Sequence, residues 1–253
     1  MRFFKGTLAY DGSYYNGWQF QPNVPTVQGH LETALTKLCP TPVRVAASSR
    51  TDSGVHALGQ VISFSLPDEV PYSCKVIQNS LNANTPRTIV LHHLEECPEN
   101  FHSIRDNRSK RYRYIVLDTP LSEPFLRGYV WHFPRKLDVE AMAQGAQYLL
   151  GEHDFSSFET AGAPRKSSVR NLFDISVKRE PMLNAAFSDP IAFEVEANGF
   201  LYHMVRNIVG TLIAVGTGRK EPQWIQEVLA AKNRVAGGQG APAYGLYLLR
   251  IRY

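Results

Sequence analysis

The sequence predicts an α+β fold, with a largely antiparallel sheet covered by a few helices. Apolar and polar residues alternate over several segments, as in half-buried strands, whereas other segments repeat their apolar residues at helical spacing. Many of the strand segments follow one another along the chain, and no fixed-period repeat is visible among its 253 residues. This mixture favours a mainly antiparallel sheet over alternating strand and helix units.

The first half of the chain is expected to supply strands and two helices. A helix begins after Thr26, whose side chain can cap it, because an apolar stripe with helical period follows. The stripe consists of Val27, Leu31, Ala34, Leu35 and Leu38. The second helix is expected at 76–81. The strands are expected at 2–10, 43–47, 62–66 and 88–94.

The second half repeats this style. Asp138 is placed as the N-cap of a helix that runs to Leu150 and stops at Gly151. Two further helices are expected, at 200–215 and 224–232. The strands are expected at 111–117, 169–177, 191–197 and 246–251.

Two subdomains are expected to meet near residue 105. Residues 1–105 form the N-terminal subdomain and residues 106–253 the C-terminal one, and together they make one catalytic unit. No flexible linker separates them. A cleft between the two halves would be the natural place for a binding site.

Composition narrows the class of protein. Hydrophobic residues make up 43% and charged residues 20%, which is typical of a globular chain. No apolar run approaches the roughly 18 residues of a membrane span, and the N-terminus is too polar for a signal peptide, so we expect a cytoplasmic protein without a membrane contact. The net charge of +4 indicates a nucleic-acid partner only weakly.

The charged segment 48–60 is the most informative part of the chain. It places Arg50, Asp52 and His56 between two predicted strands, and loops on a rigid scaffold are where functional groups are presented. Asp52 is a candidate nucleophile or general base. The alternative is a structural aspartate that holds a tight turn with Ser53 and Gly54.

Arg206 is the second candidate. It lies in a predicted helix whose apolar residues cover most of the circumference, and a buried guanidinium needs an anion. Asp52 is a candidate partner, and such a pair would keep its carboxylate ionised at neutral pH. His203, Asn207 and Gly210 share the side of the helix on which Arg206 lies.

Basic and aromatic residues alternate in the third segment, 105–114. On a strand, Lys110, Tyr112 and Tyr114 share one face, while Arg111 and Arg113 share the other. One face could present a tyrosine to a cleft while the other meets phosphate. A solvent-exposed edge strand protected by its charges explains the pattern equally well.

Other kinds of site find less support. The tripeptide at 52–54 resembles that of aspartic proteases, but those enzymes need two such aspartates and the chain has one. The three cysteines and the histidines at 30, 92 and 93 have no metal-ligand spacing, so we expect no metal site. No phosphate-binding glycine motif follows a predicted strand, so we expect no nucleotide cofactor.

Together these segments resemble the tRNA pseudouridine synthase A family. The family motif Gly-Arg-Thr-Asp-Ala-Gly-Val-His-Ala corresponds to residues 49–57, where Ser49 replaces the usual glycine and Ser53 the usual alanine. The motif Gly-Gln-Val follows at 59–61. Further matches lie at 17–19, 26–28, 101–102, 112–114, 203–210 and 245–248.

The resemblance implies a pseudouridine-synthase fold, in which two α/β subdomains share a largely antiparallel sheet with helices on its outer faces and a central active-site cleft. It implies isomerisation of uridine to pseudouridine at positions 38, 39 and 40 in the anticodon stem-loop of tRNA. The base is detached from C1′, turned and rejoined through C5. The family works as a homodimer with tRNA spanning both subunits, and no metal or organic cofactor is implied.

The resemblance also implies roles for individual residues. Asp52 would be the nucleophile, whether it attacks the sugar, attacks the base or first removes a sugar proton. Arg206 would pair with Asp52, Tyr112 would stack on the target base, and Arg50 would help to extrude the nucleotide. The remaining expected substrate contacts are His56, Arg111, Arg113, His203 and Asn207. An RNA chaperone without turnover is the alternative on the same scaffold.

Overall fold

The computed structural model describes residues 1–162, 166–181 and 189–253. They form two compact units, one made of residues 1–108 and 247–253 and the other of residues 109–246. Each unit combines helices with a mainly antiparallel set of strands, so the predicted α+β class is confirmed. Residues 247–253, which the sequence assigned to the second subdomain, belong to the first unit.

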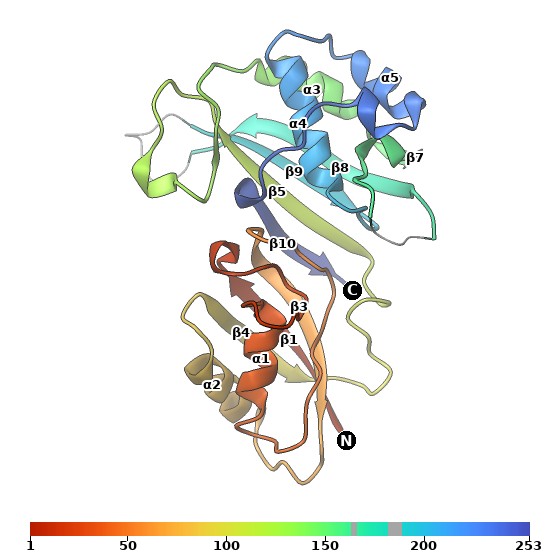
Figure 1. The fold of residues 1–253 in the computed structure, drawn as a ribbon. Coiled ribbons are helices and arrows are strands. Elements are labelled where there is room, and N and C mark those ends of the chain that lie inside the picture. Colours follow the sequence, from red (N-terminus) through yellow and green to blue (C-terminus); the bar gives the residue numbers. More distant parts are fainter. Residues whose placement is uncertain (163–165, 182–188) are drawn as a thin grey trace. The chain divides into compact units, whose positions relative to one another are not determined.

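The first unit is built on strands in the order β4-β1-β3-β10 (Figure 1). β1 pairs antiparallel with both β3 and β4, β10 runs parallel to β3, and the short β2 adds to β3. The strands are Arg2–Tyr10 (β1), Ala46–Ala47 (β2), His56–Leu66 (β3), Ile89–Glu96 (β4) and Leu246–Arg252 (β10). The expected strand at 43–47 is therefore reduced to two residues.

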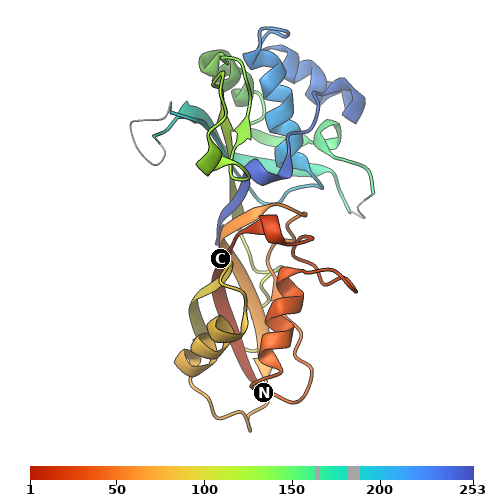
Figure 2. The same cartoon turned by 60° about the vertical axis from the view of Figure 1, so that its left-hand side comes forward.

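Two helices, α1 (Val27–Leu35) and α2 (Cys74–Asn84), cover one face of this sheet (Figures 1 and 2). The predicted cap of α1 is confirmed, because the Thr26 side chain accepts a hydrogen bond from the amide of Gly29. The helix turns Val27, Leu31 and Leu35 inward, where at most 1% of each is exposed. The apolar stripe of the sequence up to Leu35 is thus the inward face of α1, whereas Leu38 lies in a turn after the helix and is half-buried.

The second unit has strands in the order β5-β9-β8-β7, with β6 beside β5. β9 pairs antiparallel with both β5 and β8, and it is buried along its whole length. The strands are Ser109–Leu117 (β5), Trp131–His132 (β6), Gly151–Asp154 (β7), Val169–Arg179 (β8) and Ile191–Ala197 (β9).

The helices of the second unit are α3 (Val139–Gln147), α4 (Met204–Gly216) and α5 (Trp224–Ala231). α3 and α4 lie on one face of its sheet (Figure 1). Short 3-10 helices complete the described chain: Gly12–Tyr14 (η1), Pro124–Leu126 (η2), Ser156–Phe158 (η3), Arg234–Ala236 (η4) and Ala243–Gly245 (η5). Among the described residues, no helix has the length and apolar character that a membrane crossing requires.

Two expectations for the second unit were wrong in detail, and two short strands were missed. The helix expected from residue 200 begins at Met204, because His203 adopts a left-handed conformation with φ of 60° that no α-helix can contain. The helix expected to reach Leu150 ends at Gln147, and Gly151 opens β7. Neither β7 nor β6 was expected, because strands of four and two residues are too short to show an alternating pattern.

The cap of α3 can be tested by substitution. The Asp138 carboxylate accepts a hydrogen bond of 2.9 Å from the amide of Ala141, as the sequence predicted. We expect Asp138→Ala to lower the free energy of unfolding by about 1 kcal/mol, while Asp138→Asn, which still caps, has a much smaller effect. Urea denaturation of the three proteins measures the difference. Equal midpoints for the alanine and asparagine variants would show that the cap does not matter.

Candidate active site

Asp52 lies in a tight turn of the loop between β2 and β3 and is half-buried. Its main-chain carbonyl oxygen accepts a hydrogen bond of 3.1 Å from the amide of Val55. Gly54, the third residue of this turn, has a φ of 80°, a value that a turn of type II needs and that glycine adopts at no steric cost. The glycine of the motif therefore shapes the backbone that presents the Asp52 side chain.

Buried polar side chains of the sheet hold the loop that carries Asp52. Gln60, on β3 and 0% exposed, accepts a hydrogen bond of 3.2 Å from the amide of Ser49 and donates one of 2.6 Å to its carbonyl oxygen. The Tyr10 hydroxyl, at the end of β1, lies 2.7 Å from Oγ1 of Thr51. Both neighbours of Arg50 are thus held by side chains that come from the two central strands of the unit.

The segment 11–18 fixes the loop from another side. The Trp18 amide donates a hydrogen bond of 3.0 Å to the carbonyl oxygen of Thr51, and Oγ of Ser53 donates one of 3.2 Å to the carbonyl oxygen of Tyr15. A Cβ atom on Gly17 would lie 2.7 Å from the Thr51 carbonyl oxygen. The backbone of the Asp52 turn is therefore packed directly against another backbone, with no side chain between them.

Arg50 and His56 differ in their surroundings. The Arg50 side chain is exposed and forms no ion pair with a residue that the structure describes. His56 is only 2% exposed, and its Nδ1 accepts a hydrogen bond of 3.1 Å from the amide of Gly12. Nδ1 also lies 3.1 Å from the carboxylate of Asp11, and the ring stacks on Tyr247 with centroids 4.7 Å apart. His56 therefore ties β3 to η1 and β10.

On β5, Tyr112 and Lys110 share one face as predicted. Tyr112 is buried, and its ring meets Phe200 edge-on with centroids 5.0 Å apart. Phe200 belongs to the segment that leads into α4. Burial, together with the nearby positive charge of Arg170, lowers the pKa of Lys110 to about 8. This face of β5 is directed toward the beginning of α4.

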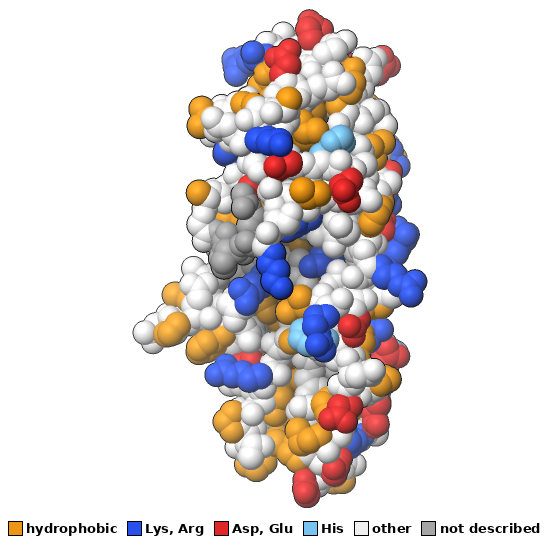
Figure 3. Space-filling model, turned by 90° about the vertical axis from the view of Figure 1, so that its right-hand side faces the viewer, with side chains coloured by type: hydrophobic (Ala, Val, Ile, Leu, Met, Phe, Trp, Pro, Cys, Tyr) orange, Lys and Arg blue, Asp and Glu red, His pale blue; other side chains and the backbone are white. Residues whose placement is uncertain are grey.

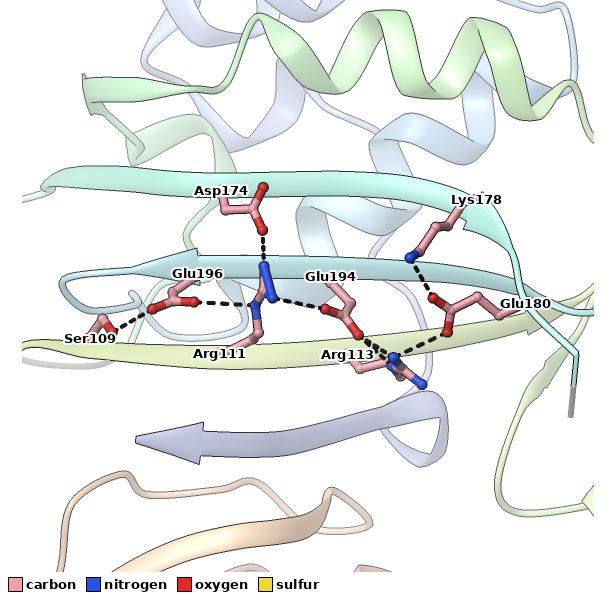
Figure 4. Close-up of polar contacts among 8 residues, drawn as sticks. All are labelled: Ser109, Arg111, Arg113, Asp174, Lys178, Glu180, Glu194 and Glu196. Atoms are coloured by element: carbon pink, nitrogen blue, oxygen red, sulfur yellow. Dashed lines mark hydrogen bonds and ion pairs between the residues drawn. The ribbon is translucent and has the colours of Figure 1, made fainter. Parts of the chain in front are cut away.

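Arg111 and Arg113 lie on the other face of β5, in a ladder of charged side chains (Figure 4). Arg111 forms ion pairs with Asp174, Glu194 and Glu196. Arg113 pairs with Glu194 and Glu180. The two arginines that were expected to contact substrate are thus matched by carboxylates of their own sheet, which the sequence did not reveal.

The beginning of α4 carries the remaining expected site residues. The His203 ring stacks on Tyr202, and its Nδ1 lies 3.2 Å from Oγ1 of Thr160. Asn207 is buried, with its amide group donating to the carbonyl oxygen of Phe158 at 2.8 Å. Arg206 is half-buried, and its Nε donates a hydrogen bond of 2.7 Å to the carbonyl oxygen of residue 241.

The structure brings the expected residues together in two groups. Arg50, Asp52 and His56 lie within one short stretch of the first unit, and Tyr112 lies near the beginning of α4, with Arg206, in the second. The pairing of Asp52 with Arg206 joins residues of different units and stays a prediction. Within residues 1–162, 166–181 and 189–253, no three His, Cys, Asp or Glu side chains are grouped to hold a metal ion.

Sequence reasoning gave no role to several residues that build these groups. Tyr10 and Gln60 fix the Asp52 loop, and Arg234 reaches the amide of Asn207. The signal for Gln60 was a polar amide directly before the apolar residues Val61 and Ile62 of a strand, since a buried amide must be hydrogen-bonded. No comparable signal marks Arg234, whose partner Asn207 lies 27 residues away in the chain.

Comparison with known proteins identifies the family. A family model for tRNA pseudouridine synthase matches residues 8–105 and 146–253. A protein of Thermoanaerobacter sp. (strain X514), named tRNA pseudouridine synthase A, is 39% identical over 246 residues, or 97% of both chains. A protein of the same name from Coxiella burnetii (strain Dugway 5J108-111) is 44% identical over 248 residues, which cover 97% of this chain and 91% of its own.

A third relative, tRNA pseudouridine synthase A 1 of Bacillus cereus, is 42% identical over 253 residues, or 98% of both chains. The fold, the matched motif and these relatives define an isomerase of the pseudouridine synthase class. Within that class, the chain belongs to the tRNA pseudouridine synthase A family, which confirms the resemblance in its motifs.

The buried Tyr10 hydroxyl gives the first unit a pH dependence. Burial raises the pKa of Tyr10 to about 12, above the value near 10 of an unfolded chain. The resulting stability is fully present below about pH 10 and is lost as the pH rises toward 12. We expect Tyr10→Phe to flatten this fall, measured as the urea midpoint against pH. Tyr14→Phe, at an exposed tyrosine, is the control, and an unchanged slope in Tyr10→Phe would contradict the assignment.

Proposed function

We propose that this enzyme converts uridine to pseudouridine at positions 38, 39 and 40 in the anticodon stem-loop of tRNA. The observation that carries the proposal is Asp52, presented on a turn that the surrounding main chain and buried side chains hold in place. A carboxylate in a rigid loop is suited to chemistry that needs a fixed nucleophile or base. The family supplies the reaction class, and the relatives named above supply tRNA as the substrate.

In this proposal the chemistry begins at the Asp52 carboxylate. It attacks C1′ of the sugar, attacks the base, or removes a proton from the sugar, and each route releases the base from the bond between N1 and C1′. The base then turns and C5 bonds to C1′, with any bond to Asp52 broken and any proton taken from the sugar returned. C5 finally loses its proton and N1 carries one, so that the product is an isomer of uridine. Arg206 pairs with the Asp52 carboxylate and keeps it oriented.

The target nucleotide has to leave the stem before it can react, because its reacting atoms are inaccessible inside a paired helix. Arg50 suits the task of extruding it, since its side chain is exposed and has no acidic partner in the described part of the chain. Tyr112 stacks on the extruded base. Unstacking costs a few kcal/mol, which contacts with the tRNA backbone offset.

Recognition of tRNA rests mainly on its shape and its phosphates. The chain has a net charge of +4, and exposed Lys and Arg side chains are visible among acidic and apolar ones on the face drawn in Figure 3. Because Arg111 and Arg113 have carboxylate partners, arginines outside the ladder are better suited to phosphate. We further propose that the enzyme acts as a homodimer in the cytoplasm.

The role of Asp52 can be tested directly. We expect Asp52→Asn to lower pseudouridine formation by at least about 1,000-fold, because the neutral amide can neither attack nor accept the proton. Binding of tRNA should change far less. The measurement is single-turnover formation of pseudouridine in tRNA, with binding measured in parallel.

Asp68→Asn, which removes the same charge at an exposed position, is the control and should keep full activity. Full turnover by Asp52→Asn would end the assignment of the nucleophile. Binding of tRNA without turnover by the unmodified protein would favour the RNA chaperone instead.

The target positions require a separate experiment. We expect tRNA from cells that lack this protein to carry uridine at positions 38, 39 and 40, and to regain pseudouridine when the wild-type protein, but not Asp52→Asn, is supplied. Mapping pseudouridine at single-nucleotide resolution provides the measurement. Loss of pseudouridine at other positions alone would refute the proposed specificity.

A further inference from the structure

The segment 237–242, here called the strap, crosses the surface of α4 between η4 and η5. Glycines line both sides of the crossing. A Cβ atom on Gly210 of α4 would overlap the carbonyl oxygen of Gln239, and one on Gly238 of the strap would lie 2.6 Å from the carbonyl oxygen of Gly210. The two backbones are therefore as close as glycine alone permits.

Side chains of the second unit fix the first part of the strap. The Gly238 amide donates a hydrogen bond of 3.1 Å to Oγ1 of Thr211. Nη2 of Arg234 donates to the Gly238 carbonyl oxygen at 2.7 Å and to Oδ1 of Asn207 at 3.0 Å. Burial lowers the pKa of Arg234, whose nitrogen donates here to uncharged oxygens.

The far end of the strap is fixed to the sheet. The Tyr114 hydroxyl donates a hydrogen bond of 2.8 Å to the carbonyl oxygen of Pro242. Tyr114 is fully buried and stands two residues after Tyr112 on the same face of β5. The strap is thus attached at one end to α4 and at the other to the strand that carries the base-stacking candidate.

Between these attachments, Ala241 makes two hydrogen bonds with Arg206. Its amide donates to the Arg206 carbonyl oxygen at 3.0 Å, and its carbonyl oxygen accepts from Nε of Arg206 at 2.7 Å. Ala241 is 0% exposed. One residue of the strap therefore holds both the backbone and the side chain of Arg206.

We propose that the strap is a positioning element for Arg206, and this inference rests on the function proposed above. A long arginine side chain has many rotamers, and a single acceptor at Nε fixes the plane of its guanidinium. In a site that needs Arg206 to meet a carboxylate, this orientation must exist before substrate binds. Asn207 and Arg234 are then positioning residues that hold the strap, and Asn207 was expected to contact substrate.

Gly210→Ala tests the strap at its closest approach. The new methyl group would push Gln239 outward, and Ala241 would move with it. We expect kcat for pseudouridine formation to fall by about 100-fold, the scale of a misplacement of about 1 Å, with KM for tRNA changed less than about twofold. Gly216→Ala is the matched control, because it lies in the same helix but meets the flexible Met142 side chain.

Arg234→Met is the second variant, in case Gly210→Ala fails to fold. It removes both hydrogen bonds of Nη2 while it keeps an apolar stem in place. We expect a smaller fall of kcat, about tenfold, because Thr211 and Tyr114 still hold the strap. Arg219→Met removes the same charge from an exposed position after α4 and should leave kcat unchanged.

A double variant separates positioning from general damage. In an Arg206→Lys background there is no Nε donor for Ala241 to orient, so Gly210→Ala or Arg234→Met should lower the residual kcat by less than about twofold. The proposal would be overturned if Gly210→Ala or Arg234→Met lowered kcat by the same factor in the Arg206→Lys background as in the wild type. It would also be overturned if the folded single variants kept the kcat of the wild type. The activities of the wild type and of Asp52→Asn are measured in the same experiment. An inactive wild type, or a fully active Asp52→Asn, would show that the proposed reaction fails, independently of the strap.

Discussion

The Asp52 turn exists because two stretches of backbone approach each other more closely than any side chain would permit. A Cβ atom on Gly12 would overlap the carbonyl oxygen of Val55, and Gly17 stands in the same relation to Thr51. This close approach allows Trp18 to donate its amide to the loop. The position of the carboxylate then follows from main-chain packing, which is stiffer than a side-chain contact.

In both units, buried amide side chains form hydrogen bonds that hold segments near the candidate site residues. Gln60 satisfies the amide and the carbonyl oxygen of Ser49, as a neighbouring strand would, although no strand lies there. The Asn207 amide group donates to the carbonyl oxygen of Phe158, the last residue of η3, and its oxygen accepts from Arg234. Both amides are buried. Asn207 directly follows Arg206 in the chain, and Gln60 holds the loop that carries Asp52. Because a half-satisfied buried amide is costly, these bonds favour one arrangement of the loops.

The sequence predicted what depends on local pattern. The caps at Thr26 and Asp138, the strand at 191–197 and the two faces of β5 were correct because the period of apolar residues and a capping side chain are local properties. Asp52 and Arg206 were candidates because of their residue types and positions, Tyr112 because of its face on a basic strand, and the family motifs supplied the roles of all three. The acidic partners of Arg111 and the strap beside Arg206 were missed, since they depend on contacts between residues distant in the chain.

The parallel strand β10 has a consequence for the order in which the molecule is made. Residues 247–253 complete the sheet of the first unit, where Tyr247 stacks on His56 directly after the Asp52 turn. A ribosome synthesises them only after the whole of the second unit. The Asp52 turn therefore lacks its last neighbour during translation, and a truncated nascent chain cannot assemble this part of the site. Synthesis of β10 is thus a condition for the native packing around His56.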